Sequence, residues 1–257
     1  MAKKQKSCLY VKEPLSNVRK SYILKFSARC IILVLCVLIL FFDPEQLDIL
    51  KGLNFFKKFS LLHLLWGVWV FDMLCQLLPI RKKIALGSQK IFKERFRPIK
   101  EKINSHALKE YVISTTRAAY KVLVLWSLLI TALGILHYCG ILSDSMLFIV
   151  SVVFYLCDLI CVLFWCPFRL ILKNRCCTTC RIFNWDHLMM FTPMIFVGGF
   201  FSISLLLMAL IVWLVWELCF GAHPERFWEN SNEALKCSSC TDKLCIQYCQ
   251  KLRKNQP

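Results

Sequence analysis

The sequence predicts an all-α protein, a polytopic transmembrane helical bundle of about five spans that ends in a short cysteine-rich tail. Composition is the first reason. Of 257 residues, 58% are hydrophobic and 19% are charged, whereas a soluble domain has about 45–50% apolar and about 25% charged residues. The second reason is that the apolar residues gather in runs of about 20, enough for a helix to cross a hydrocarbon core of about 30 Å.

The basic residues indicate a membrane partner. The formal net charge of +17 comes from 33 Lys and Arg against 16 Asp and Glu. These cations lie mainly in segments that flank the apolar runs, which favours a topological role and attraction to anionic lipid headgroups. A nucleic-acid partner would need a basic face on a soluble fold, so we do not expect one. The sequence leaves open a redox partner and a homo-oligomer.

The first two spans follow a basic N-terminus, residues 1–22. The apolar run 23–42 is too long for the core of a signal peptide and has no small-residue cleavage motif after it, so we expect it to be retained. A second span is predicted at about 59–78, because Pro79 stops the helix.

The loop 80–121 is the longest polar connection and the most basic one. Within it, apolar side chains recur at helical spacing at Phe92, Phe96, Ile99 and Ile103. With Lys and Arg between them, this pattern fits a helix in the headgroup plane that Pro98 kinks or divides. A solvated charged loop is the equal alternative.

The third and fourth spans are predicted at about 122–142 and 146–166, joined by a very short turn. Pro167 ends the fourth span, and a cysteine-containing loop, residues 173–187, follows it.

The last apolar run, 188–220, is long for one span and short for two. A Thr-Pro pair at 192–193 and a Gly-Gly pair at 198–199 can divide it. We therefore expect a re-entrant or shallow segment at 188–199 and a fifth span at about 200–220.

Lys and Arg in short loops mark the cytoplasmic side of a membrane protein. By this rule the N-terminus, the loop 80–121 and the cysteine loop face the cytoplasm of a multi-pass cell-membrane protein. The transmembrane domain is residues 23–220. The tail, 221–257, has no cation excess after the last span, and five spans place it outside.

The chain has 16 Cys. About half lie in apolar runs, where a buried thiol behaves as a small hydrophobe. Two further groups lie in the strings NRCCTTCR and CSSCTDKLCIQYC, at Cys176, Cys177 and Cys180 and at Cys237, Cys240, Cys245 and Cys249.

The tail group predicts a metal site. Its four thiolates are close enough in sequence to surround one tetrahedral ion, and a C-x-x-C turn lets two sulfurs bind the same metal. Zinc and an iron–sulfur cluster are the candidates, since both prefer sulfur ligands. The loop group would form a second site. Three alternatives remain open: two disulfides in an exported tail, one four-sulfur site shared by both groups, and thiol exchange at Cys177 and Cys180, where nearby Arg lowers a thiol pKa.

The strings CDLICVLFWCPF, NRCCTTCRIFNWD and HPERFWENSNEALKCSSCTDKLC resemble a family of uncharacterised prokaryotic membrane proteins with such cysteine-rich stretches. The resemblance covers residues 155–245. It supports the two cysteine groups as features of interest, and it implies no activity.

Ionisable residues inside the spans form another candidate site. Asp72 and Asp158 are predicted at comparable depth, and an intramembrane carboxylate is by default a functional candidate. Together they can share a proton or hold a cation in a transport path, or each can be hydrogen-bonded structurally. His63 and His137 also match in depth, as a bis-histidine haem would require, although interfacial histidines make haem the weaker reading.

The leading hypothesis is therefore an integral membrane protein with a cysteine-ligated metal or iron–sulfur site that serves electron transfer or metal handling. Its competitor is a transporter or channel that uses Asp72 and Asp158, with structural cysteines. A non-catalytic membrane scaffold is the third. No hydrolase triad, phosphate-binding loop or dinucleotide motif is present, so the sequence leaves enzyme activity open.

Overall fold

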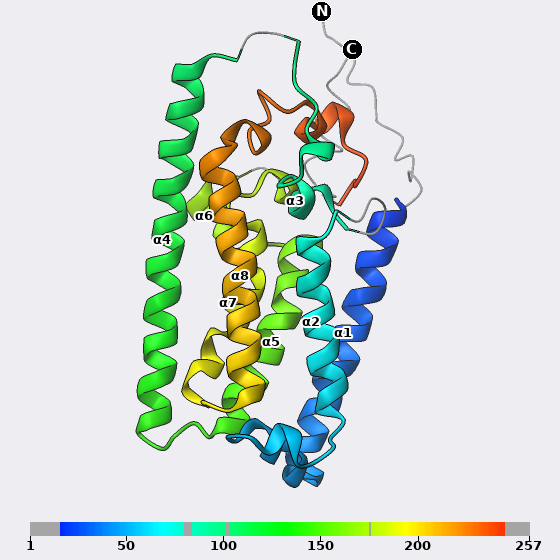
Figure 1. Ribbon diagram of the computed structural model, residues 1–257, viewed down its shortest axis with the longest axis vertical. Coiled ribbons are helices and arrows are strands. Elements are labelled where there is room, and N and C mark those ends of the chain that lie inside the picture. Colours follow the sequence, from blue (N-terminus) through cyan, green and yellow to red (C-terminus); the bar gives the residue numbers. More distant parts are fainter. Residues whose placement is uncertain (1–15, 80–83, 101–102, 175, 245–257) are drawn as a thin grey trace, which may run out of the picture.

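A computed structural model describes residues 16–79, 84–100, 103–174 and 176–244 of the protein. The described part is helical and contains no strand, so the all-α prediction is confirmed there. Four of its helices are long and apolar enough to cross a membrane: α1 (Asn17–Phe42), α4 (Ser105–Tyr138), α5 (Asp144–Leu163) and α8 (Phe200–Ala222). They run roughly along the long axis of the bundle (Figure 1), and they indicate a multi-pass membrane protein.

The second predicted span is shorter than the others. Helix α2 (Leu62–Leu77) has 16 residues, which is about 24 Å at the rise of an α-helix. Two 3₁₀ turns, η1 (Pro44–Leu50) and η2 (Asn54–Phe56), connect α1 to α2 at the lower end of the bundle in Figure 1. Helix α1 ends where Pro44 follows Asp43, and α2 ends just before Pro79.

The first part of the basic loop does not form the headgroup-plane helix, which is one of its two predicted alternatives. Residues 84–100 fold over the upper end of the bundle as α3 (Leu86–Gln89) and the 3₁₀ turn η3 (Lys93–Arg95), and no helix in the headgroup plane is formed by them. Pro98 is the physical reason, because the residue before a proline is disfavoured in the α conformation. The segment instead pairs with the tail, through a bridge between Pro98 and Asn232 and the Ile99 N–H donated to Ser231 O.

The third span begins much earlier than predicted. Asn104 caps α4 by accepting hydrogen bonds from the backbone N–H groups of His106 and Ala107. The polar second half of the predicted loop is therefore the first half of α4. A hydropathy pattern marks the lipid-embedded part of a helix, and a helix continues beyond it wherever its polar turns meet water.

The segment 186–199 runs along the bundle beside α8. It comprises α7 (Asp186–Phe191) and the 3₁₀ turn η6 (Thr192–Phe196). Its beginning lies near the upper end, where Gln76 donates to Asp186, and its end lies near the lower end, where the Phe196 ring contacts those of His137 and Tyr138.

The chain reverses into α8 at the predicted Gly pair. Gly198 has φ +71°, a conformation that other residues rarely adopt. A Cβ on Gly199 would lie 1.8 Å from Leu50 O, so only glycine allows this close approach to the lower turn. Phe200 then donates its N–H to Gly52 O at 2.8 Å.

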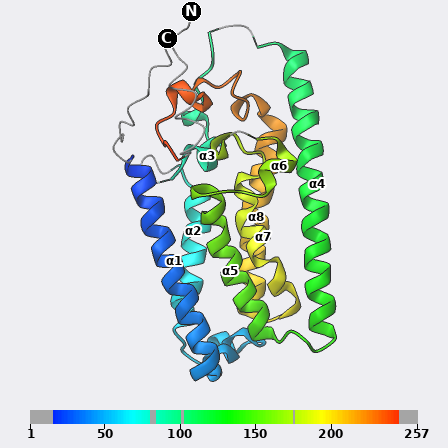
Figure 2. The ribbon, with the colours of Figure 1, turned by 180° about the vertical axis from the view of Figure 1, so that it is seen from behind.

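The described part of the tail lies at the same end of the bundle as the start of α1, whereas the five predicted spans would put these two segments at opposite ends (Figures 1 and 2). Ser16 Oγ donates to Asp242 O at 2.6 Å, and Leu86 N donates to Asp242 Oδ2 at 2.7 Å. The physical reason is the short 186–199 segment, which adds one more pass along the bundle. The remainder of the tail, including Cys245 and Cys249, lies outside the described residues.

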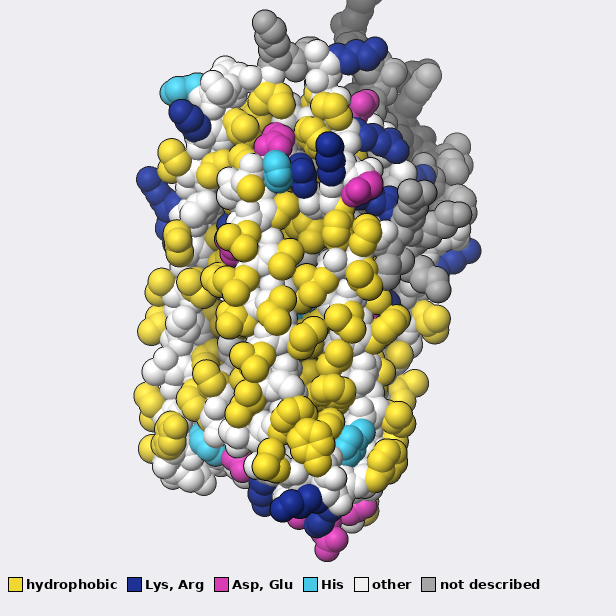
Figure 3. Space-filling view, in the orientation of Figure 1, with side chains coloured by type: hydrophobic (Ala, Val, Ile, Leu, Met, Phe, Trp, Pro, Cys, Tyr) yellow, Lys and Arg dark blue, Asp and Glu magenta, His cyan; other side chains and the backbone are white. Residues whose placement is uncertain are grey.

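Apolar side chains both fill and coat the bundle. Trp69, Phe148, Phe191 and Phe201 form the centre of the main core, between α2, α5, α7 and α8. Figure 3 shows hydrophobic side chains over the middle of one face, with Lys and Arg towards both ends. Large exposed apolar residues on every long helix fit contact with lipid.

Candidate functional site

Two adjoining cavities lie within the upper half of the bundle. The first, here the charged cavity, has a volume of about 590 Å³ and lies between α1, α2 and α5, with residues from α3 and the 183–187 segment closing it. Its acidic, basic and histidine side chains come from four parts of the chain: Lys25, Arg29, Asp72, Asp158, Asp186 and His187.

Arg29 joins the two predicted aspartates. Its side chain is only 7% exposed, and its Nη1 donates to Asp158 Oδ2 at 2.8 Å and to Tyr155 O at 2.5 Å. Its Nη2 lies 3.9 Å from Asp72 Oδ2, and the guanidinium stacks 3.7 Å from the centre of the Tyr155 ring. The structure thus brings Asp72 and Asp158 together, through an arginine that the sequence analysis did not single out. The signal was present, because Lys25 and Arg29 are cations within an apolar run.

The other carboxylates of the charged cavity also have polar neighbours. Asp72 lies 3.7 Å from Lys25 Nζ and accepts a 3.4 Å hydrogen bond from the Tyr155 hydroxyl. Asp186 accepts from Gln76 Nε2 at 3.0 Å and lies 3.2 Å from His187 Nδ1. Three carboxylates therefore face two permanent cations, and the protonation of His187 decides whether one negative charge remains.

Several polar atoms that line the charged cavity have no partner in the described part of the chain. They are Gln76 Oε1, Ser88 Oγ and Arg29 Nε, all of them buried. A buried polar atom without a hydrogen bond costs about 1–3 kcal/mol. Such atoms around one cavity fit a polar occupant that completes their hydrogen bonds.

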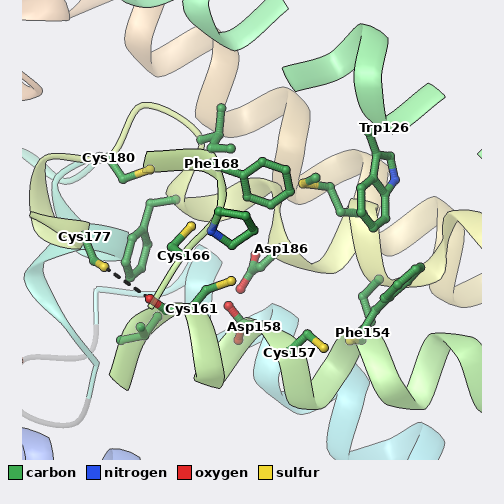
Figure 4. A pocket seen from close by; sticks show the side chains of 16 residues that line it. Trp126, Phe154, Cys157, Asp158, Cys161, Cys166, Phe168, Cys177, Cys180 and Asp186 are labelled. Atoms are coloured by element: carbon green, nitrogen blue, oxygen red, sulfur yellow. Dashed lines mark hydrogen bonds between the residues drawn. The ribbon is translucent and has the colours of Figure 1, made fainter. Parts of the chain in front are cut away.

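The second cavity, here the sulfur cavity, has a volume of about 230 Å³. Figure 4 shows five cysteines around it, from α5, from the turn after α5 and from the 176–180 loop: Cys157, Cys161, Cys166, Cys177 and Cys180. The aromatic rings of Trp126, Phe154 and Phe168 form another part of its wall. Asp158 and Asp186 line both cavities and therefore stand in the wall that separates them.

The thiols of the sulfur cavity contact one another in part. Cys161 and Cys166 share a side-chain hydrogen bond, and Cys177 Sγ donates to Cys161 O at 3.8 Å. The hydrogen bond from Cys161 lowers the pKa of Cys166 to about 7, and the backbone N–H groups of Phe168 and Arg169 contribute to this shift.

The structure corrects the expectation that arginine activates Cys177 and Cys180. Burial raises the pKa of both thiols. Arg181, the described arginine of the predicted pair, is turned away to form a two-pronged ion pair with Glu217. Glu217 also accepts from Trp185 Nε1 at 2.8 Å, so this arginine holds the loop to α8 and does not serve the thiols.

Lys90 also holds the 176–180 loop in place. Its ammonium donates to Thr178 O at 3.1 Å and to Cys180 O at 2.8 Å, and it lies 4.9 Å from the centre of the Trp216 ring. Burial lowers the pKa of Lys90 to about 7. Lys90 thus fixes the backbone that carries Cys177 and Cys180.

The predicted metal ligands are only partly within the described residues. Among these, no group of three or more His, Cys, Asp or Glu side chains is arranged to hold a metal ion. Cys176, Cys177 and Cys180 surround the short turn η4 (Cys177–Thr179), and Cys237 and Cys240 surround the turn η9 (Cys237–Ser239). The four-ligand tail site stays a prediction, because Cys245 and Cys249 lie outside the described residues.

The two histidines considered for haem are engaged with nearby protein groups. His63 Nδ1 accepts from Ser60 N at 3.1 Å, and its Nε2 lies 2.8 Å from Phe55 O. His137 Nδ1 lies 2.8 Å from Leu142 O, and its Nε2 lies 3.6 Å from Asp144 Oδ1. These contacts fasten the turns at the lower end of the bundle.

No protein-family model, no curated protein and no solved structure matches this chain. The resemblance to a prokaryotic membrane family rests on the cysteine strings alone. The two cavities are therefore the features of this protein that indicate its function.

Proposed function

We propose that this protein is a membrane transporter in which the charged cavity binds a small cation or amine-bearing solute. The observation that carries the proposal is Arg29, a buried guanidinium in α1 that joins Asp72 of α2 to Asp158 of α5 on the cavity wall.

The depth of this network supports a functional role. Arg29 lies about 18 Å along α1 from its first residue, near the middle of the helix. A charged residue at the centre of a membrane helix costs about 2.5–3.5 kcal/mol or more, and such residues commonly mark substrate and ion pathways. A single ion pair would suffice to fasten α1 to α5. Six acidic, basic and histidine side chains around one cavity, with unpartnered polar atoms among them, are better explained by an occupant.

The balance of charge selects the class of solute. With His187 neutral, Lys25 and Arg29 leave one of the three carboxylates uncompensated, so the cavity favours a single positive charge. Gln76 Oε1 offers a further acceptor for an N–H donor. A volume of about 590 Å³ is in the range of ordinary small-molecule sites.

The same balance of charge couples the binding of the solute to the binding of protons. A proton on His187 and a cation in the cavity neutralise the same excess charge, so each weakens the binding of the other, and this coupling is reciprocal. An exchange of protons for the solute follows from it.

The path of the chain supports six membrane crossings in this proposal. Helix α2 and the 186–196 segment complete the four long helices, and thinning of the bilayer accommodates their shorter lengths. Both described chain ends then lie on one side. The Lys and Arg residues of 84–100 put that side in the cytoplasm.

Thermal unfolding of the purified protein in mild detergent tests this function. The probes are chloride salts of sodium, potassium, choline and putrescine at pH 6 and pH 8, with N-methylglucamine chloride as the ionic-strength control. At least one probe is expected to raise Tm by about 5 °C at saturating concentration. The increase should be larger at the higher pH, where a smaller fraction of His187 carries a proton.

Asp72→Asn should abolish this stabilisation, whereas Asp48→Asn, which changes a partly exposed carboxylate at the lower end, should retain it. A Tm that none of the four probes shifts, or a shift that persists in Asp72→Asn, would contradict the proposal. A cation found by this assay would then be tested for counterflow in liposomes.

A cysteine-ligated metal or iron–sulfur site remains the second candidate function. The observation in its favour is the tight turn in which Cys240 N donates to Cys237 O at 3.4 Å, as in a C-x-x-C metal grip. Elemental analysis of anaerobically purified protein tests it. Stoichiometric zinc or iron that Cys240→Ser removes would support the site, and metal-free wild-type protein would contradict it. A scaffold that binds anionic lipid through its basic segments is what remains if neither Asp72→Asn nor Cys240→Ser has an effect.

A further inference from the structure

The transport proposal leaves the sulfur cavity without a role. Its thiols come from segments that the fold brings back onto the end of α5. After Leu163 the chain leaves the helix, with the N–H groups of Phe164 and Trp165 both donated to Ile160 O. This tight turn returns Cys166 to Cys161, and the two thiols are hydrogen-bonded. Thiols in such contact need only small shifts to reach the length of a disulfide.

The surroundings of this pair are apolar and aromatic. The ring centre of Trp126 of α4 lies 4.9 Å from that of Phe154 of α5 in a tilted contact, and 6.5 Å from that of Phe168 in an edge-on contact. Figure 4 shows these rings on one side of the cavity and the Cys161 and Cys166 side chains near its centre. Aromatic walls favour a flat ring in an offset or edge-on contact. The cavity volume of about 230 Å³ fits a single small ring system better than a chain of polar groups.

Metal binding explains this arrangement less well than redox chemistry does. A metal requires several thiolates at once, and burial in apolar surroundings disfavours the charged form of each. Moreover, the cysteines described here are not grouped as a metal site. A dithiol and its disulfide are both neutral, so an apolar cavity can hold either form.

We propose that Cys161 and Cys166 are a redox-active dithiol that reduces a lipid-soluble quinone bound against Trp126, Phe154 and Phe168. In this step the two S–H bonds break and one S–S bond forms between the cysteines. The two electrons and two protons that they release pass to the quinone, whose two carbonyl oxygens become the hydroxyl groups of the quinol. The dithiol is oxidised and the quinone is reduced, and no other reactant is needed.

The position of the cavity fits a lipid-soluble reactant. Cys157, Cys161 and Phe154 belong to α5, and Trp126 belongs to α4, both of which are helices able to span the membrane. A ring dissolved in the bilayer can approach between these two helices. Asp158 and Asp186 separate this cavity from the charged one, so the redox step is independent of the transport proposal.

The test uses the full-length protein in detergent, reduced with a phosphine that is then removed, under anaerobic conditions. The probe is decylubiquinone, whose ring has no unsubstituted carbon for thiol addition. The expected result is one quinol formed per protein, the loss of two of the 16 thiols to maleimide labelling, and a Cys161–Cys166 disulfide in the peptide mass spectrum.

Cys161→Ser and Cys166→Ser should each reduce quinol formation by at least tenfold. Cys139→Ser, which changes an exposed thiol at the end of α4 that does not line the cavity, is the matched control and should retain the reaction. Quinol formation that survives in both variants, a disulfide between other cysteines, or no reaction of the wild type would overturn the proposal.

A second measurement guards against variants that fail to fold. Phe168→Leu keeps the dithiol and removes part of the aromatic wall, so it should raise the decylubiquinone concentration needed for half-maximal rate several-fold. The wild type should also show quenching of tryptophan fluorescence by the quinone, and Trp126→Phe should lose that part of the quenching. An unchanged concentration dependence in Phe168→Leu together with unchanged quenching in Trp126→Phe would contradict binding at this wall.

Discussion

The two cavities share Asp158 and Asp186 but are held together by different forces. In the charged cavity the ionised side chains face opposite charges, and Arg29 serves two carboxylates at once. Apart from the two shared aspartates, the sulfur cavity is lined by thiols and apolar side chains, which make weak contacts such as the 3.8 Å hydrogen bond from Cys177.

Because of this difference, the two cavities should tolerate different substitutions. Removing one partner of a buried ion pair leaves an uncompensated charge, which is far more costly than the loss of the pair as a whole. Removing a thiol from an apolar wall leaves no such charge. The charged cavity should therefore respond strongly and non-additively to substitution, and the sulfur cavity weakly and additively.

The largest effect is expected from Arg29→Met. It leaves Asp72 and Asp158 facing each other without their shared cation, at a cost of about 3–5 kcal/mol. Reversible unfolding in SDS–detergent mixtures, followed by tryptophan fluorescence, measures it. The double variant Arg29→Met/Asp158→Asn should regain more than half of the loss, because the second change removes one uncompensated charge. A double variant less stable than Arg29→Met would show that the two residues do not form one network.

A smaller effect is expected at Lys90, the cation that fastens the loop of the sulfur cavity. Its pKa is lowered to about 7 by burial, against about 10.4 in an unfolded chain. Between these values the unfolded state binds more protons, so wild-type stability should rise with pH, by about 1 kcal/mol per unit. Below about pH 7 the cost of burying the charged Lys90 ammonium lowers the stability of the folded state in full, and above about pH 10.4 this cost is absent.

The variant Lys90→Met isolates this contribution. The difference in unfolding free energy between wild type and variant should change steadily from pH 7 to pH 9 in favour of the wild type. If the unfolding free energies of the two proteins changed with pH in parallel, folding would not lower the pKa of Lys90.

A still smaller effect is expected from Cys161→Ala. The thiol already borders open space, so its loss should cost about 1 kcal/mol or less. Cys36→Ala is the matched comparison, because Cys36 is buried in the packed core and is only 3% exposed. Its removal leaves a new void and should cost about 1–2 kcal/mol. Equal losses in the same unfolding assay would mean that the sulfur cavity is as tightly packed as the core.

The smallest effect is expected from Lys25→Met. Its side chain is 44% exposed and lies 3.7 Å from Asp72, so the pair is worth at most about 1 kcal/mol. This variant is also the control for Arg29→Met, since both remove one cation of the charged cavity. A loss of stability as large as that of Arg29→Met would show that the buried arginine and the exposed lysine contribute equally to the charged cavity.

Hydropathy located the long helices but not all of their ends. The span predicted at 200–220 corresponds to Phe200–Ala222, and the one at 146–166 to Asp144–Leu163. The helix predicted at 122–142 is Ser105–Tyr138, because a helix can extend out of the lipid with polar residues on its surface. The 186–196 segment was missed as a pass along the bundle, since it is too short and too interrupted for a length criterion based on a regular helix.

The sequence by itself determined the class of this protein and one half of its candidate site. Long apolar runs bounded by Lys and Arg leave few alternatives to a multi-pass helical membrane protein, because backbone polar groups in lipid must bond within their own helix. The carboxylates within the runs, Asp72 and Asp158, could be identified for the same reason, since charge there is costly.

Which of these residues contact one another follows from the tertiary structure alone. Arg29 lies far from Asp72 and Asp158 in the sequence, and its pairing depends on how α1 packs against α5. The sulfur cavity depends on a tight turn after α5 and on a loop that folds back to it, neither of which follows from cysteine spacing. Local pattern fixes depth and secondary structure, whereas contacts between distant segments follow from packing that no local pattern encodes.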